Sequence, residues 1–311
     1  KLPPEVKNAI SDSNTFKLSR YNLATISGSS ISIIDPLDNQ KPQIVANGNK
    51  PWDIITVPEF NKMYISNFGD STILVIDLKS LKVIKEINFD KTALITKLGI
   101  SPAKDKIYVL NFGLNKISSV STATDEINTN EIKLNNSART FIVDNLGRLL
   151  LFNASGLVIQ TDSGSVINSL DFKISFSYDK AIYSKQTNTL LLVPSSGNNL
   201  ASYDLSSDKA TEIQLKENIV SAAFNPSGDK IYALSASSLS ILESGTMKVL
   251  RENIPINTTG ANNMIFSPDG RRLFITSGSN VSIFDINNES MISEHLELNG
   301  PADNIIAWSN N

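Results

Sequence analysis

Cysteine is absent from this chain of 311 residues, and histidine occurs only once. The lack of cysteine excludes disulfides, thiolate metal sites and a cysteine nucleophile. A single histidine, His295, argues against haem ligation, histidine-centred zinc sites and a Ser–His nucleophile pair. The G-x-S-x-G, P-loop and dinucleotide-binding fingerprints are missing as well. The sequence therefore predicts no catalytic residue, no metal site and no cofactor.

An excess of positive charge and a long apolar run are also missing. Lys and Arg number 28 against 31 Asp and Glu, and the net charge of -3 has the wrong sign for a non-specific nucleic-acid binder. No uncharged apolar stretch approaches the ~18 residues that a membrane span needs. The first residues, KLPPEVKNAISD, lack the apolar segment of a signal peptide. We therefore expect no nucleic-acid partner and no membrane span in this chain.

An apolar segment recurs along most of the chain at a step of about 42 residues. Such a period is typical of the four-stranded blades of a β-propeller. Seven copies are found, at NLATIS (Ala24), KMYISN (Tyr64), KIYVLN (Tyr108), RLLLFN (Leu150), TLLLVP (Leu191), KIYALS (Tyr232) and RLFITS (Phe274).

Each copy contains four strand signals separated by turn residues. The turns are rich in Pro, Asn, Asp, Gly and Ser, as in NPSGDK (225–230) and SPDGRR (267–272). The first two strands are apolar on both faces, whereas last strands such as KVIKEINF alternate apolar and polar residues, as an outer rim should. We therefore predict an all-β, seven-bladed β-propeller with four-stranded antiparallel blades in one domain spanning 1–311. Residues 1–20 are expected to form an N-terminal extension or a partial strand.

The first copy lacks an obvious first strand of its own. The C-terminal GPADNIIAWS (300–309) matches the first-strand pattern of GANNMIFSP (260–268). The N-terminal AISDSNTFKL has suitable spacing but a different composition, and it is the alternative. We favour closure of the ring by the C-terminal strand, because pairing the last segment with the first removes an open sheet edge.

Several units resemble the YVTN family of β-propeller repeats. The resemblance rests on YISN (64–67), YVLN (108–111), VIDLKSLKVIKEI and NNMIFSPDGRRLFITSGSNVSIFDI, whereas copies four and five depart from the motif. That family is typical of surface-layer and other exported proteins of archaea and bacteria, so the resemblance implies an extracellular or cell-surface location. It also implies that motif residues such as Tyr64, Asn67, Asp77, Tyr108 and Asn111 are structural.

The residues that precede each first strand are the candidates for function. By analogy with other propellers, they converge at the axial mouth. Trp52 offers a stacking surface there, and Arg139 a fork for a carboxylate. A salt-bridge network lining a water-filled channel is the simpler interpretation of the same residues. The candidate ligand-binding residues are Trp52, Asp53, Arg139, Asp179, Lys180, Asn262, Asn263, Asp303 and Asn304.

Two functions are compatible with these residues. The first is a non-catalytic cell-surface scaffold that binds a protein or glycan partner through its axial face. The alternative is a calcium-dependent, lactonase-like hydrolase, in which Asp53, Asp179 and Asp303 hold the ion.

Overall fold

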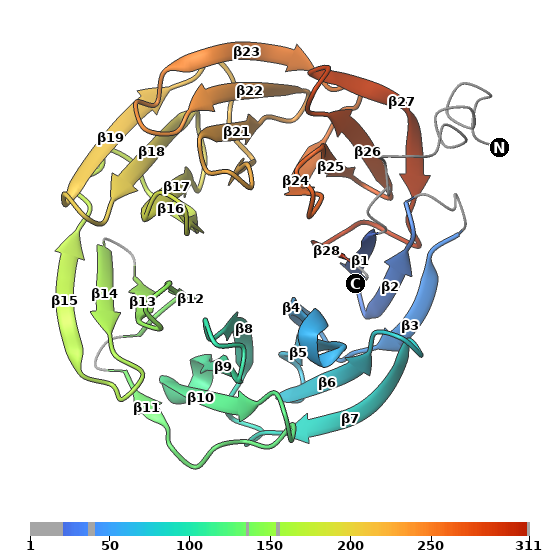
Figure 1. Ribbon diagram of the computed structural model, residues 1–311, viewed down its shortest axis with the longest axis vertical. Helices are drawn as coiled ribbons and strands as arrows, with labels where there is room; N and C mark the ends of the chain where they lie inside the picture. Colours follow the sequence, from blue (N-terminus) through green and yellow to red (C-terminus); the bar gives the residue numbers. More distant parts are fainter. Residues whose placement is uncertain (1–20, 37–40, 135–136, 154–155, 310–311) are drawn as a thin grey trace, which may run out of the picture.

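Seven four-stranded antiparallel sheets surround a central axis in the computed structural model of the protein (Figure 1). The structure describes residues 21–36, 41–134, 137–153 and 156–309. The predicted all-β, seven-bladed propeller is confirmed, and all seven recurring segments lie on the second strand of a blade. The expected extension at 1–20 lies outside the described residues. None of the helices in the described ranges has the length and apolarity to span a bilayer.

The blades are numbered along the chain, and their strands are given from the axis outwards. Blades one and two consist of β28 (Asn304–Ser309), β1 (Tyr21–Ser27), β2 (Ser30–Ile34) and β3 (Gln43–Asn47), then β4 (Pro51–Val57), β5 (Lys62–Asn67), β6 (Thr72–Asp77) and β7 (Lys82–Asn88). Blades three and four consist of β8 (Ile95–Ile100), β9 (Lys106–Asn111), β10 (Lys116–Ser121) and β11 (Ile132–Lys133), then β12 (Thr140–Val143), β13 (Leu149–Phe152), β14 (Gly156–Gln160) and β15 (Val166–Asp171).

Blades five to seven follow the same order. Blades five and six consist of β16 (Tyr178–Ser184), β17 (Thr189–Pro194), β18 (Asn199–Asp204) and β19 (Lys209–Gln214), then β20 (Ser221–Phe224), β21 (Lys230–Leu234), β22 (Ser238–Glu243) and β23 (Val249–Pro255). Blade seven consists of β24 (Ala261–Phe266), β25 (Arg272–Ser277), β26 (Asn280–Asp285) and β27 (Ser290–Glu297). Two short 3-10 helices, η1 (Pro58–Phe60) and η2 (Phe112–Leu114), occupy turns.

Burial follows the predicted gradient from inner to outer strands. The middle strands β5 and β6 are almost entirely buried, because neighbouring blades cover both of their faces. The outer strands β7 and β19 are mostly exposed, and His295 lies exposed on the outer strand β27. Blade three differs from the prediction, since its last strand shrinks to β11 and one isolated bridge between Val120 and Ile127.

The C-terminal strand closes the ring, which confirms the predicted closure. β28 pairs antiparallel with β1 in a register that runs from Tyr21↔Ser309 to Ile26↔Asn304. The Asp303 N–H donates to the Ile26 carbonyl at 2.8 Å, just beyond the paired segment. Figure 1 shows β28 between the inner strands β24 and β4, so the last segment joins blades seven, one and two.

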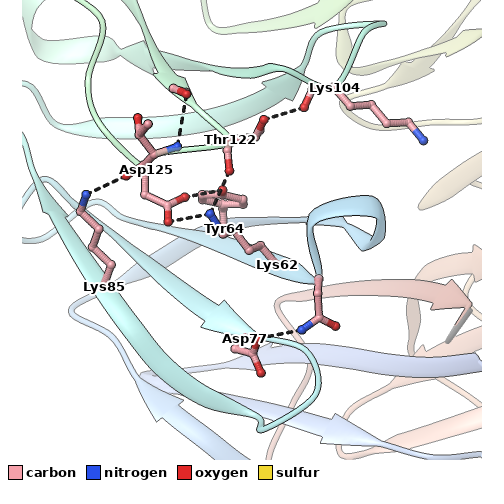
Figure 2. Close-up of polar contacts among 10 residues, drawn as sticks. Lys62, Tyr64, Asp77, Lys85, Lys104, Thr122 and Asp125 are labelled. Carbon is pink, nitrogen blue, oxygen red and sulfur yellow. Dashed lines mark hydrogen bonds and ion pairs between the residues drawn. The ribbon is translucent and has the colours of Figure 1, made fainter.

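A lysine and a tyrosine two residues apart connect one blade to the next. Tyr64 of β5 is buried, and its hydroxyl donates to Asp125 Oδ1 at 2.6 Å (Figure 2). Lys62 Nζ lies 2.7 Å from Asp125 Oδ2 and also donates to the Thr122 carbonyl. Asp125 belongs to the turn that connects β10 to β11 in blade three. The tyrosine motif therefore has a structural role, as the sequence predicted.

The other motif residues are structural as well. The Asn67 side chain donates to the Thr72 hydroxyl at 3.0 Å, and that of Asn111 donates to the Ser118 hydroxyl at 2.6 Å. Asp77 accepts a hydrogen bond from the Asn61 side chain at 2.6 Å. These polar groups hold the ends of strands and turns, which is why the motif repeats.

The buried tyrosines predict a loss of stability at alkaline pH. Burial raises the pKa of Tyr21, Tyr178 and Tyr232 to about 12, and it raises the pKa of Tyr64 further, aided by its hydrogen bond to Asp125. Below about pH 10 these phenols are protonated in both states, so their stabilisation is complete. Above that, the unfolded chain loses protons that the folded chain keeps. The free energy of unfolding should fall by up to about 2 kcal/mol per tyrosine between pH 10 and 12.

Urea unfolding at pH 8, 10 and 11.5 measures this loss, and Tyr232 supplies the control. Its hydroxyl has no hydrogen-bond partner among the described residues. Tyr232→Phe should therefore leave stability at pH 8 within about 1 kcal/mol of the wild type and make the alkaline decline shallower. An unchanged urea midpoint from pH 8 to 11.5 would contradict the prediction.

Candidate functional site

A cavity of about 1120 Å³ opens at the axial mouth, on the face where the chain enters the inner strands. Successive strands are antiparallel, so the turns from second to third strands lie on this same face. The structure brings eight of the nine candidate residues to the cavity wall. They are Trp52, Asp53, Arg139, Asp179, Lys180, Asn263, Asp303 and Asn304.

Asp53 joins three blades at the mouth. Its buried carboxylate accepts the Leu98 N–H at 2.9 Å and lies 2.9 Å from Lys97 Nζ, both of blade three. The Asn304 side chain of blade one donates to its other oxygen at 3.2 Å. Buried carboxylates need partners of this kind, and Asp53 has them on both oxygens. Its role in the described structure is to hold the inner strands together.

Asp303 and the asparagines also bind the protein itself. Asp303 Oδ2 accepts the Gly28 N–H at 2.9 Å, which fastens the last segment to blade one. Asn263 Oδ1 accepts the Met264 N–H at 2.9 Å. Asn262, the ninth candidate, is not part of the cavity wall, and its side chain accepts the Thr276 hydroxyl at 2.6 Å. Much of the polar ring is therefore hydrogen-bonded within the protein, and Asp53–Lys97 is the one ion pair among the described residues that line the cavity.

Trp52 is different, because 57% of its surface is exposed at the rim of the cavity. Its ring packs against Phe68 with centroids 5.7 Å apart and planes tilted by 36°. Phe68 lies in the turn between β5 and β6 and is half-buried. The two rings form an apolar shelf beside a polar opening.

Cations on the cavity wall outnumber the carboxylates that are free to meet them. Lys97 is paired with Asp53, and Lys180 only reaches the Val220 carbonyl at 3.5 Å. Within the described ranges, no carboxylate lies within ion-pair distance of Arg139 or Lys50. A guanidinium group that lines a cavity and has no ion-pair partner can bind a carboxylate through two parallel hydrogen bonds.

The three aspartates do not form a metal centre. In the part of the chain that the structure describes, no group of three or more His, Cys, Asp or Glu side chains is placed to hold an ion. Asp53 and Asp303 direct oxygens towards N–H groups of the protein. Calcium requires six to eight oxygen ligands, so this arrangement gives no support to the calcium-dependent hydrolase.

Sequence reasoning missed part of the mouth. Asn49 and Lys50 precede β4, as the candidates precede their strands, but they were not among those chosen. Phe68, Gly28 and Ser29 line the cavity from turns between second and third strands, which were not considered. The strand order contained the signal, because in an antiparallel blade these turns return to the face where the inner strand begins. Phe68 in particular stands out in the sequence as an aromatic residue in a turn.

A second cavity, of about 970 Å³, lies towards the opposite face beside blades three and four. It adjoins the shortened edge of blade three and is lined by Lys106, Tyr108 and Asp162. Lys106 Nζ and Asp162 Oδ2 are 2.9 Å apart, but Asp105 and Glu131 also line the cavity, so its charge balance is negative. No residue of this cavity was predicted to bind a ligand.

Comparisons with known proteins identify the fold. Neither a family model nor a curated protein matches the chain. Among solved structures, it is similar to a functionally unknown protein from Desulfotomaculum acetoxidans, with 12% identity and a TM-score of 0.72 over 94% of this chain and 100% of that one. It is also similar to AztD from Citrobacter koseri, with 12% identity and a TM-score of 0.70 over 94% and 99% of the two chains.

An enzyme shares the same architecture. Hydrazine synthase from Kuenenia stuttgartiensis is 15% identical, with a TM-score of 0.66 over 81% of this chain and 88% of that chain. At these identities the likeness shows the fold alone, and a propeller can host unrelated functions. The structural neighbours and the strand order together establish that the chain is a seven-bladed β-propeller.

Proposed function

We propose that this propeller is a non-catalytic scaffold that binds a partner at its axial mouth. The observation that carries the proposal is the exposure of Trp52 at the rim of the cavity. A large aromatic side chain in water is costly to leave uncovered, and tryptophan is among the residues that contribute most to binding when a partner covers it. Phe68 supports the ring from the side, so little conformational freedom is lost on binding.

The charges of the mouth favour an anionic partner. The cavity is lined by Lys50, Arg139 and Lys180. Of its three carboxylates, those of Asp53 and Asp303 already accept hydrogen bonds from backbone N–H groups, and Asp179 is the third. A carboxylate of a protein side chain or of an acidic glycan can meet the Arg139 fork beside the Trp52 ring.

Intrinsic fluorescence can test binding, since the chain contains only 2 tryptophans. Trp308 is 3% exposed inside the ring, so a change caused by a ligand at the mouth should come from Trp52. We expect emission to shift on titration with hexaglutamate or trigalacturonate but not with maltotriose. Arg139→Gln should weaken binding at least about tenfold, as loss of a charged hydrogen bond does.

Two variants are the controls. Trp52→Phe should abolish the fluorescence change, which leaves Trp308 as the silent reporter. Arg251→Gln removes an exposed arginine of the outer strand β23 and should leave the affinity unchanged. The proposal fails if neither anionic probe changes the emission at millimolar concentration, or if Arg139→Gln and Arg251→Gln have equal effects.

We also propose that the protein works outside the cell or on its surface. The resemblance of YISN and YVLN to YVTN repeats supports this location, and the lack of cysteine is compatible with it. Treating whole cells with a protease tests the proposal: a surface protein should be degraded while a cytosolic marker survives. Protection of the protein in intact cells would overturn it.

A further inference from the structure

An aromatic side chain occupies the turn between second and third strands in two blades only. Blades two and three carry Asn-Phe-Gly at this turn, at residues 67–69 and 111–113. The other five blades have small or polar residues there: GS (28–29), NAS (153–155), SSGN (195–198), SAS (235–237) and GS (278–279). The ring is therefore not symmetrical on the face that holds the mouth.

The fold accounts for two of the three residues in this motif. The asparagine side chain is buried and hydrogen-bonded, as described for Asn67 and Asn111. The glycine is needed for close packing: the Gly113 N–H donates to the Ala93 carbonyl at 2.9 Å, and a Cβ on Gly113 would lie 2.2 Å from the Thr92 carbonyl oxygen. The phenylalanine has no such role, because Phe112 is 50% exposed.

Four apolar side chains of these two blades form what we call the aromatic arc: Trp52, Phe68, Phe112 and Leu114. Trp52 and Phe68 line the cavity, whereas Phe112 and Leu114 lie on the next blade outside its wall. Phe112 and Leu114 are both exposed on the short helix η2. Apolar side chains are therefore exposed on this face of the ring both at the mouth and on the turn of blade three.

We propose that the partner is a protein that places an acidic segment in the mouth and apolar side chains on the aromatic arc. This inference rests on the proposed function and adds the class of partner. Four cations (Lys50, Lys97, Arg139, Lys180) and three carboxylates (Asp53, Asp179, Asp303) line the cavity, a balance of +1 in a chain of net charge -3. This local balance complements an acidic segment.

Phe112 and Leu114, the two residues of the aromatic arc outside the cavity, favour a protein partner over a glycan. A sugar ring needs hydrogen-bonding groups beside the aromatic face on which it stacks, and the mouth supplies them near Trp52. Phe112 and Leu114 have wholly apolar side chains, and a leucine offers no flat face for stacking. A tryptophan, an arginine and exposed apolar side chains on one face of the ring are instead the residue types enriched at protein–protein interfaces.

A library of random 12-residue peptides displayed on phage supplies the probe. Peptides selected on the wild-type protein should combine Asp or Glu with apolar residues. Synthesised and titrated, they should bind Phe112→Ser and Arg139→Gln at least about tenfold more weakly than the wild type. The matched control is Phe60→Ser: Phe60 is 41% exposed on the 3-10 helix η1, in the turn between β4 and β5 on the opposite face. It should leave affinity unchanged.

The outcomes separate this inference from the proposed function. If Arg139→Gln weakens binding and Phe112→Ser does not, the partner is confined to the mouth, so the inference fails and the proposed function stands. If trigalacturonate binds and no peptide is selected, the result is the same. If neither variant weakens peptide binding, or if Phe60→Ser weakens it equally, the inference fails, and the fluorescence titration decides the proposed function separately. Equal urea midpoints of the three variants would establish that they fold.

Discussion

Ending the chain at Asn299 is expected to abolish cooperative folding at 37 °C. This truncation removes β28, which pairs with β1 over six residue pairs and supplies the inner strand of blade one. Trp308 and Ile305, both buried, leave the core with it. Loss of a buried tryptophan and a buried isoleucine side chain costs about 5–10 kcal/mol together. That is comparable with the whole stability of a typical domain, about 5–15 kcal/mol.

Three measurements check this expectation. The truncated protein should show no urea transition by circular dichroism, whereas a chain that ends at Ser309 should unfold like the chain of 311 residues. A synthetic peptide of residues 300–309 should restore the transition, because the vacated edge of β1 can accept a strand in trans. If the truncated chain unfolds at the same urea concentration as the full chain, closure by β28 does not stabilise the ring.

Most of the fold was predictable because the repeat is a local property of the sequence. Each blade needs the same apolar second strand, so Tyr64 and its counterparts recur at one spacing and mark the blades. Closure was predictable for the same reason, since residues 300–309 follow the pattern of an inner strand. Blade three departs from the prediction at β11, because the shortening of one outer strand alters neither the period nor the composition.

The candidate site was only half predictable. The register of the repeat was enough to place Trp52 and Arg139 at the mouth. It did not indicate which polar side chains would be paired within the protein. The ion pair of Asp53 with Lys97 and its hydrogen bond with Asn304 join residues of three different blades. Such partners depend on side-chain geometry across blade boundaries, which no single repeat encodes. The exposure of the Trp52 side chain was not predictable either, because it depends on how the side chains of neighbouring loops pack around it.

The contact between blades two and three also combines a residue that the repeat predicts with a partner that it does not. Tyr64 was predicted as a buried aromatic, but its partner Asp125 lies 61 residues further on, in a turn of the next blade. Asp125 adopts a left-handed backbone conformation with φ of 56°, which Asp and Asn tolerate better than most residues. A turn aspartate thereby becomes an acceptor for two buried donors, Tyr64 and Lys62.

Replacing that aspartate should be the most costly single substitution at a blade boundary. The Asp125 side chain is 9% exposed, and its two oxygens receive the Lys62 ammonium and the Tyr64 hydroxyl (Figure 2). In Asp125→Asn, the amide keeps the shape and the backbone conformation, but it turns an N–H group towards one donor and leaves the Lys62 charge uncompensated. We expect the free energy of unfolding to fall by about 3 kcal/mol in urea titrations.

The adjacent boundary supplies a matched control. Lys106 is the counterpart of Lys62 on the next blade and pairs with Asp162 between blades three and four, but Asp162 lies earlier in its turn than Asp125 does and is 51% exposed. Asp162→Asn should therefore cost less than about 1 kcal/mol, as exposed ion pairs do. A double-mutant cycle completes the test: Lys62→Met combined with Asp125→Asn should cost at least about 1 kcal/mol less than the two single changes added together. Equal losses for Asp125→Asn and Asp162→Asn would show that burial does not govern these contacts, because each substitution replaces a carboxylate that pairs with the first lysine of a second strand across a blade boundary.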